Sequence, residues 1–193
     1  ARDGGGIFNG GTMTISNSTI ANNQTNTDRG GGIFNDGTIT MSNSTIAYNT
    51  ANSGEGGGIW NHGTMMTTSN STIADNQAGI AGGGIYNDVD GTMTISNSTI
   101  ANNQAGSFGG GIVYGGIGLM NIGATILAGN GGGNCALPSG VTDQGYNLES
   151  GTTCGFTAST DQQNTNPQFQ GGLQSNGGPT QTIALPSTSP AVD

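Results

Sequence analysis

The stretch GGGIFNDGTITMSNSTIAYNT at residues 30–50 decides the fold. Within it, apolar and polar residues alternate in Thr38-Ile39-Thr40-Met41-Ser42, which is typical of a β-strand with one buried face. The spacing that would place apolar residues along one side of a helix is absent. The stretch therefore predicts short strands separated by sharp corners, with the glycine triplet at a corner too crowded for side chains.

Copies of this stretch recur along the chain at almost constant spacing. The glycine triplets begin at residues 4, 30, 56 and 82, each 26 residues after the last, and a degraded fifth copy begins at residue 109. A repeat with strands and no helix cannot bury its apolar face alone, so neighbouring copies must stack. We therefore predict an all-β single-stranded parallel β-helix (β-solenoid) of about five coils, for which crossover chirality favours right-handed winding.

Stacking places equivalent residues of successive coils in columns about 4.8 Å apart. The inward columns are expected to be aliphatic, and they comprise Ile7, Ile33, Ile59, Ile85 and Ile112; Ile20, Ile46, Ile73, Ile100 and Ile126; and Met13, Ile15, Ile39, Met41, Met93 and Ile95. Two asparagine columns are expected at corners, because asparagine tolerates left-handed backbone angles and its amide can bond the next coil. These columns comprise Asn17, Asn43, Asn70 and Asn97, and Asn23, Asn49, Asn76 and Asn103.

Two copies of the repeat contain insertions. One extra residue around Met65-Met66 in the third copy predicts a β-bulge. Two extra residues at Val89-Asp90 in the fourth copy predict a longer loop.

The composition excludes two classes of function. The 193 residues include 39 glycines, and 2 Lys+Arg against 11 Asp+Glu give a net charge of −9. Nucleic-acid binding needs a cationic stripe that contacts phosphates, which this sequence lacks. No apolar run approaches the length that crosses a bilayer, so no membrane span is expected.

The repeat GGGIFNGGTMTISNSTIANN at residues 4–23 resembles the surface-exposed repeats of polymorphic outer membrane proteins and other pectin-lyase-like β-helices. The segments ATILAGN (124–130), GYNLES (145–150), GGLQSNGGPTQTIALP (171–186) and SPAVD (189–193) resemble the C-terminal region of bacterial choice-of-anchor Q proteins. The resemblance implies an exported bacterial protein with a right-handed β-helix, located outside the cell or on its surface. It also implies that the chain is a processed form or a fragment of a longer protein.

Cys135 and Cys154 are the only cysteines, and their spacing is too wide for a CxxC redox or zinc motif. We expect a structural disulfide between them, formed in an oxidising compartment, that fastens the end of the solenoid. All five prolines lie beyond residue 130. The sequence thus predicts β-helix repeats over residues 1–130 and an irregular, disulfide-bonded C-terminal capping segment over 131–193 that covers the open strand edges of the last coil.

The sequence contains few of the residues that known β-helix enzymes use for catalysis. Pectate lyases use an arginine or lysine base, and polygalacturonases use clustered aspartates with cationic partners. Here Arg2 and Arg29 are the only Lys or Arg residues, and a net charge of −9 would repel a polyanionic substrate. We predict that the chain is not an enzyme, with a carbohydrate-binding or polysaccharide-cleaving β-helix as an alternative.

One group of ionisable residues shares a position in successive coils. Asp36, His62 and Asp88 follow one another at this offset, and Asp90 lies in the adjoining loop. His62 is expected between Asp36 and Asp88 in an exposed turn of alternating charge, with a raised pKa. A metal such as calcium and a carboxylate pair of an inverting glycosidase are the alternatives; no other cofactor is expected.

Outward-facing residues indicate a binding surface. A Thr-x-Thr ladder comprises Thr12, Thr14, Thr38, Thr40, Thr92 and Thr94, with Thr64 and Thr67 displaced by the bulge. It resembles the ice-binding face of β-solenoid antifreeze proteins, although the bulge counts against that function and threonine is also an ordinary outward strand residue. An outward aromatic column comprises Phe8, Phe34, Trp60 and Tyr86, which either binds sugars or proteins or is covered by a neighbouring loop.

Taken together, these features predict a non-catalytic extracellular or cell-surface module with a structural or adhesive role. The strand edges of the first coil could pair with another molecule, so a filament or rod-forming subunit is a variant of this function. The expected partners are other copies of the chain, neighbouring surface proteins or surface glycans. An ice-binding protein that uses the threonine ladder is the second alternative.

Overall fold

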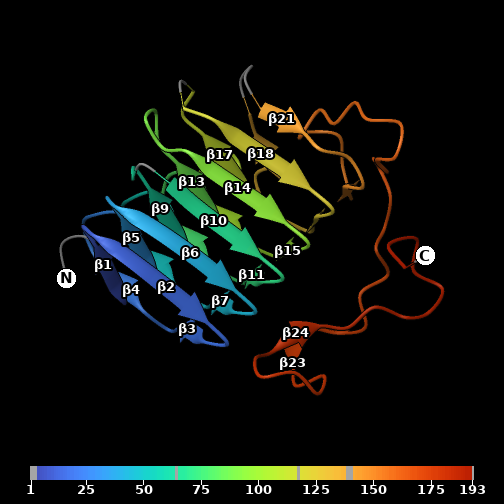
Figure 1. Ribbon diagram of the computed structural model, residues 1–193, viewed down its shortest axis with the longest axis horizontal. Coiled ribbons are helices and arrows are strands. Elements are labelled where there is room, and N and C mark those ends of the chain that lie inside the picture. Colours follow the sequence, from blue (N-terminus) through green and yellow to red (C-terminus); the bar gives the residue numbers. More distant parts are fainter. Residues whose placement is uncertain (1–3, 64, 117, 138–140, 193) are drawn as a thin grey trace.

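A computed structural model describes residues 4–63, 65–116, 118–137 and 141–192, and it is an all-β solenoid whose turns stack in chain order (Figure 1). The ladders consist of parallel strand pairs between successive turns, so the predicted parallel β-helix of about five coils is confirmed. Its right-handed winding stays a prediction. The described residues contain no helix of the length and apolar character that would span a membrane.

Four parallel sheets, here called A to D, form the sides of the solenoid. Sheet A contains β1 (Ile7–Asn9), β5 (Ile33–Asn35), β9 (Ile59–Asn61), β13 (Ile85–Asn87), β17 (Ile112–Tyr114) and β20 (Cys135–Ala136). Sheet B contains β2 (Thr12–Ser16), β6 (Thr38–Ser42), β10 (Met65–Ser69), β14 (Met93–Ser96), β18 (Met120–Gly123) and β21 (Val141–Asp143). Sheet C contains β3 (Thr19–Ala21), β7 (Thr45–Ala47), β11 (Thr72–Ala74), β15 (Thr99–Ala101), β19 (Ile126–Ala128) and β22 (Leu148–Glu149). Sheet D contains β4 (Gln24–Thr25), β8 (Thr50–Ala51), β12 (Gln77–Ala78) and β16 (Gln104–Ala105).

The core consists of aliphatic columns that run along the stack. Ile33, Ile59 and Ile85 are in register and completely buried, as the repeat predicts. Such columns place like side chains in contact on every turn, which removes their apolar surface from water and stabilises the stack.

The fifth turn differs from the expected alignment by one residue. Leu127, and not Ile126, pairs with Ile100 and enters the core, so the position predicted for Ile126 is wrong. The reason lies at the preceding corner, where Ala124 adopts the left-handed backbone angle of Asn97 (φ 47° at both). Thr125 then takes the place of a serine, and Ile126 falls in the outward column of Thr99.

The two predicted asparagine columns have different roles. In the second column, Nδ2 of Asn23 donates to Oδ1 of Asn49 at 2.9 Å, and Asn49 donates to Asn76 at 3.0 Å, as expected. In the first column, Asn17 and its equivalents have left-handed φ angles of 47–49° but exposed side chains. Among the described residues, no hydrogen bond joins the side-chain amides of successive members of this column. The predicted hydrogen bonding of these amides along the stack is therefore wrong.

A third asparagine ladder escaped sequence analysis. Its members face the interior at the end of the sheet A strands, and they are Asn9, Asn35, Asn61 and Asn87. The Nδ2 to Oδ1 distances between successive members are 2.7, 2.7 and 2.6 Å. Each buried amide therefore has a partner in the next turn, which offsets the cost of taking it out of water.

The glycine triplets occupy the crowded corner that the sequence predicts. Gly30 has a φ of +65°, which disfavours a side chain. A Cβ on Gly31 would collide with the carbonyl oxygen of Gly57 in the next turn. The corner thus requires glycine both for its backbone angle and for the close approach of successive turns.

The third turn contains no bulge within its strand, so that prediction is wrong. Met65, Met66, Thr67 and Thr68 of β10 pair without interruption with Thr38, Ile39, Thr40 and Met41 of β6. The extra residue lies between β9 and β10, because Asn61 pairs with Asn35 and Met65 pairs with Thr38. The displacement predicted for Thr64 falls outside the described residues. In the fourth coil of the solenoid, the two extra residues, Val89 and Asp90, form a local hydrogen-bonded turn in the loop, as predicted.

The C-terminal region covers the side of the solenoid at sheet C, and its first strands extend the solenoid itself. β20, β21 and β22 continue sheets A to C beyond residue 130, the boundary that the composition suggests. The chain then runs back along the solenoid to the antiparallel hairpin of β23 (Leu173–Gln174) and β24 (Thr182–Ile183) (Figure 1). Ile183 of this hairpin packs against Ala74 and Ala101, so the tail covers the outer face of sheet C.

Candidate functional site

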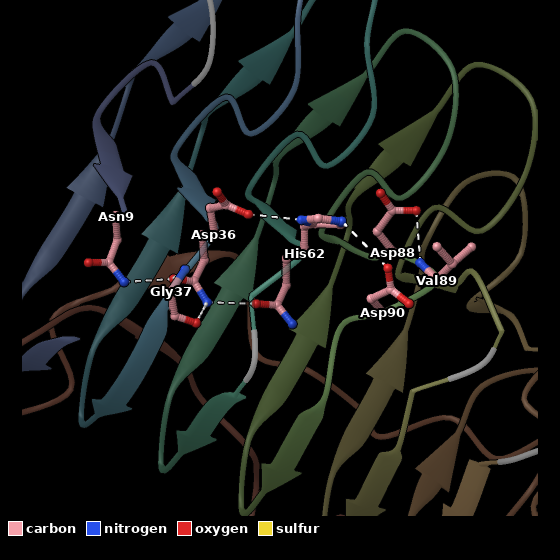
Figure 2. Close-up of polar contacts among 9 residues, drawn as sticks. Asn9, Asp36, Gly37, His62, Asp88, Val89 and Asp90 are labelled. Carbon is pink, nitrogen blue, oxygen red and sulfur yellow. Dashed lines mark hydrogen bonds and ion pairs between the residues drawn. The ribbon is translucent and has the colours of Figure 1, made fainter. Parts of the chain in front are cut away.

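The ionisable group around His62 lies along the stack of turns, at the end of sheet A (Figure 2). Nδ1 of His62 is 2.8 Å from Oδ1 of Asp36, and Nε2 is 3.9 Å from Oδ2 of Asp90. Asp88, which was expected as the second neighbour, instead accepts a hydrogen bond from the backbone N–H of Val89 at 2.8 Å. The inserted loop explains this change. It places Asp90 near the His62 imidazole, and the Asp88 carboxylate bonds the backbone of the loop instead.

The predicted rise in the pKa of His62 is confirmed. Its hydrogen bond to Asp36 raises the pKa above the ordinary value of 6.5, partial burial opposes this rise, and the Asp88 and Asp90 carboxylates add to it. Within the part of the chain that the structure describes, no group of three or more His, Cys, Asp or Glu side chains is placed to hold a metal ion. The contacts that the structure shows at His62 are those of a solvated ion pair with Asp36.

The Thr-x-Thr ladder forms the outer face of sheet B, which we call the threonine face. The first column contains Thr12, Thr38 and Met65, and it continues through Thr92 and Leu119, whose carbonyl oxygens accept hydrogen bonds from Met66 and Met93 of the preceding turns. The second column contains Thr14, Thr40, Thr67, Thr94 and Asn121. Thr67 pairs directly with Thr40 and Thr94, so the displacement predicted for it is wrong. A third column contains Ser16, Ser42, Ser69 and Ser96.

The threonine face is neutral and open to solvent. Its outward residues from Thr12 to Asn121 are all exposed or half-exposed, and none of them is charged. By contrast, the equivalent threonines of sheet C, Thr45 and Thr72, are buried, and the Thr45 hydroxyl donates to the carbonyl oxygen of Gln181 in the tail. The tail thus covers the middle of the sheet C threonine column, whereas the threonine face is accessible along its length.

The aromatic column is stacked but is mostly unavailable to a ligand. The rings of Phe8 and Phe34 lie 5.2 Å apart, and those of Phe34 and Trp60 lie 4.4 Å apart. Phe8 is 57% exposed, whereas Trp60 is only 3% exposed. Arg29, from the corner loop, lies 4.8 Å over the Trp60 ring and forms an ion pair with Glu55. A loop therefore covers the middle of the column, and Tyr86 is half-buried at its far end.

The predicted disulfide between Cys135 and Cys154 is present, and it belongs to a site that sequence analysis missed. Glu149 is completely buried between the two cysteines in the chain, and its carboxylate accepts hydrogen bonds from Asn134, from the backbone and hydroxyl of Thr153, and from the Cys154 N–H. These donors pair both oxygens of the buried side chain, which offsets the cost of taking it out of water. Between Cys135 and Cys154 the sequence carries two acidic residues, Asp143 and Glu149, and no pattern singles out Glu149 as the buried one.

Comparisons with family models, with curated proteins and with solved structures found no match for this chain. The resemblance to choice-of-anchor Q proteins and to polymorphic outer membrane repeats therefore stays a prediction. Assignment of a function depends on the geometry of the chain itself.

Proposed function

We propose that the chain is a non-catalytic adhesive module that acts outside the cell and binds flat, neutral surfaces through its threonine face. The ordered solids of matching chemistry are insoluble surface glycans such as cellulose or chitin. The observation that carries the proposal is the uninterrupted register of Thr14, Thr40, Thr67 and Thr94 on an uncovered, uncharged sheet.

A repeating flat face suits a repeating flat partner. Hydroxyls recur about 6.7 Å apart along each strand and about 4.8 Å apart between turns. Each threonine contributes one donor, two acceptor positions and a methyl group, so the array can meet both the hydroxyls and the apolar faces of packed sugar chains. Many weak contacts of this kind add up because the rigid solenoid holds them in fixed positions.

Two features support an extracellular, non-catalytic role. The Cys135–Cys154 disulfide is typical of oxidising compartments outside the cytosol. The ionisable residues that could carry chemistry lie in an exposed ion pair, with His62 held by Asp36. Other copies of the chain and neighbouring surface proteins remain further partners of this proposal, and a rod formed by end-to-end strand pairing remains its structural variant.

The experiment compares charged substitutions on two faces of the same turns. The double variant Thr40→Lys/Thr67→Lys places two charges in adjacent turns of the threonine face. The matched control Gln77→Lys/Gln104→Lys places two charges in adjacent turns of sheet D, where both glutamines are exposed. Adsorption of each protein to cellulose and to chitin is measured by depletion from solution.

We expect the intact protein and the sheet D control to adsorb equally, and the threonine-face variant to lose most of its adsorption. Both variants carry the same net charge, so a purely electrostatic effect would change both alike. Equal adsorption by all three proteins, or no adsorption to either solid, would contradict the proposal.

Ice is the second candidate partner, and a specific observation favours it. The interruption that counted against an ice lattice is absent from the strand, because Thr67 stays in register with its neighbours. Met65 and Leu119 replace threonine in the first column, but the second column is unbroken through four turns.

Ice recrystallisation assays with the same three proteins distinguish the two surfaces. Inhibition by the intact protein that disappears in Thr40→Lys/Thr67→Lys would assign ice as the partner. Inhibition that is absent at every concentration tested would reject ice and leave the glycan proposal to its own experiment.

A further inference from the structure

A groove of about 530 Å³ lies beside the last turns of the solenoid, along sheet C and the corner that precedes it. Its lining comes from sheet C (Thr99, Ile126, Leu148), from the adjoining corner (Asn97, Tyr146) and from the C-terminal tail at Pro190. The volume is in the range of small-ligand sites. Chain segments far apart in the sequence thus line one open groove, and none of its lining residues belongs to the threonine face or to the group around His62.

Hydrogen bonds between the chain segments that line the groove fix its shape. The backbone N–H of Gln162 donates to the carbonyl oxygen of Asn147 at 2.8 Å, and Nε2 of Gln162 donates to the carbonyl oxygen of Pro190 at 2.9 Å. Asn147 in turn donates its backbone N–H to Oδ1 of Asp161 at 2.8 Å. These bonds tie the tail to the last turn, so the groove exists before a ligand arrives.

The chemistry of the lining is neutral and half polar. None of its residues is charged. The Tyr146 side chain is largely exposed, with 69% of its surface accessible. Within the described residues, neither the Asn97 amide nor the hydroxyls of Thr99 and Tyr146 have an internal hydrogen-bond partner. The groove therefore offers one aromatic ring, several uncommitted polar groups and no ion.

We propose that this groove binds a short neutral oligosaccharide. The Tyr146 ring provides an apolar platform for a sugar face, and the Asn97 amide and Thr99 hydroxyl provide donors and acceptors for sugar hydroxyls. A charged ligand would find no counter-ion in the lining, and a wholly apolar ligand would leave the amide and hydroxyl groups without partners. The site is separate from the threonine face and does not depend on the function proposed for it.

The backbone at Tyr146 suggests a well-matched pair of variants. Tyr146 has a φ of 58° and Tyr48 has a φ of 56°, and Tyr48 is also exposed, at 47%, but does not line the groove. Glycine is the residue best suited to this backbone angle, so Tyr146→Gly and Tyr48→Gly both remove a ring without adding strain. Tyr146→Phe keeps the platform and removes only the hydroxyl.

Binding is measured by calorimetry and NMR titration with maltohexaose, cellohexaose, xylohexaose and mannohexaose. We expect at least one of them to bind, and Tyr146→Gly to weaken that binding about tenfold, which corresponds to about 1.4 kcal/mol. Tyr48→Gly and Thr40→Lys/Thr67→Lys should bind as the intact protein does, and Tyr146→Phe should retain most of the affinity.

Three results would overturn the proposal. They are the absence of binding by every neutral hexasaccharide at millimolar concentration, binding that Tyr146→Gly leaves unchanged, and equally strong binding of an anionic oligogalacturonate. Loss of hexasaccharide binding in Thr40→Lys/Thr67→Lys would move the site to the threonine face. A circular dichroism melt of each variant checks that it is folded. If Tyr146→Gly fails to fold, the NMR titration of the intact protein decides the question: the proposal requires shift changes at Tyr146, Thr99 and Asn97, and changes confined to other residues would contradict it.

Discussion

Thr68 is the one polar residue in the first five turns of an inward column, and its replacement by valine should stabilise the protein. The other four residues are Ile15, Met41, Ile95 and Ile122. Thr68 is completely buried and lies between Met41 and Ile95 of the adjacent turns. Among the described residues, its hydroxyl has no hydrogen-bond partner. Valine has the same shape and carries a methyl group in place of that hydroxyl, so Thr68→Val removes an unpaired polar group without creating a cavity.

The size of the effect follows from the cost of the unpaired hydroxyl. A buried polar group without a partner costs about 1–3 kcal/mol. We expect Thr68→Val to raise the free energy of unfolding by about 1–2 kcal/mol. For a chain of this length that gain corresponds to a rise in Tm of about 2–8 °C.

The assay is urea unfolding followed by fluorescence of the single tryptophan, Trp60, with calorimetry for Tm. Thr67→Val is the control, because Thr67 precedes Thr68 but faces outward, and its stability should change by less than about 0.5 kcal/mol. If Thr67→Val were the stabilising variant and Thr68→Val were neutral or destabilising, the register derived for the third turn would be wrong.

Four further outcomes follow from the same packing and electrostatics. Asn76→Ala removes a buried amide bonded to Asn103 and Ile46, and should lower the free energy of unfolding in urea by at least about 3 kcal/mol, whereas Asn70→Gly, in the exposed column, should be nearly neutral. Reduction of the disulfide, whose cysteines are 19 residues apart, should cost about 3 kcal/mol, measured as a lower Tm in dithiothreitol that Cys135→Ser/Cys154→Ser reproduces without reductant. Because the pKa of His62 is raised in the folded protein, its ion pair stabilises the fold below the ordinary pKa of 6.5, and this stabilisation is lost as the pH rises through the folded pKa. In Asp36→Asn, the His62 pKa measured by NMR titration should move back toward 6.5. An unchanged pKa would contradict the assignment. Burial alone would raise the pKa of Asp143, but hydrogen bonds from the backbone N–H groups of Thr157, Ala158 and Gly145 lower it to about 2. The contribution of Asp143 to stability is therefore present above the unfolded pKa of 3.8 and is lost as the pH falls toward 2. In Asp143→Asn, the free energy of unfolding should depend less on pH over this range.

The repeat made most of the fold predictable because each turn satisfies the same local constraints. The period fixes the number of turns, the alternation in strands such as Thr38–Ser42 fixes which side chains face inward, and the glycine triplets fix one corner. The Asn23 column was predictable for the same reason, since an amide that recurs at one position can bond its own copy. The four-sided turn was not predicted, because β4 and its equivalents are only two residues long.

The misplaced positions arise where the repeat changes length. In ATILAGN, both Ile126 and Leu127 are apolar, so alternation alone cannot say which one enters the core; the left-handed corner at Ala124 decides it. In the third turn, the composition around Met65 does not distinguish a bulge in the strand from an extra residue before it, and the pairing with β6 settles the question.

The candidate sites depended on contacts that no repeat encodes. The tail reaches back to sheet C, and this long-range contact decides that Thr45 is buried while Thr40 on sheet B stays accessible. The groove beside Tyr146 also forms only because Pro190 returns to the last turn. Sequence periodicity identified the surfaces, and tertiary contacts determined which of them are open.

Oxidation of Met65 tests the threonine face most directly. Met65 lies on that face and is 50% exposed, whereas Met41, Met66, Met93 and Met120 are completely buried. Mild peroxide should therefore oxidise Met65 in the free protein well before these four. When the protein is adsorbed to cellulose or chitin, the proposal predicts that Met65 sulfoxide forms several times more slowly. Oxidation of Met65 at the same rate in the free and the adsorbed protein would contradict binding through the threonine face.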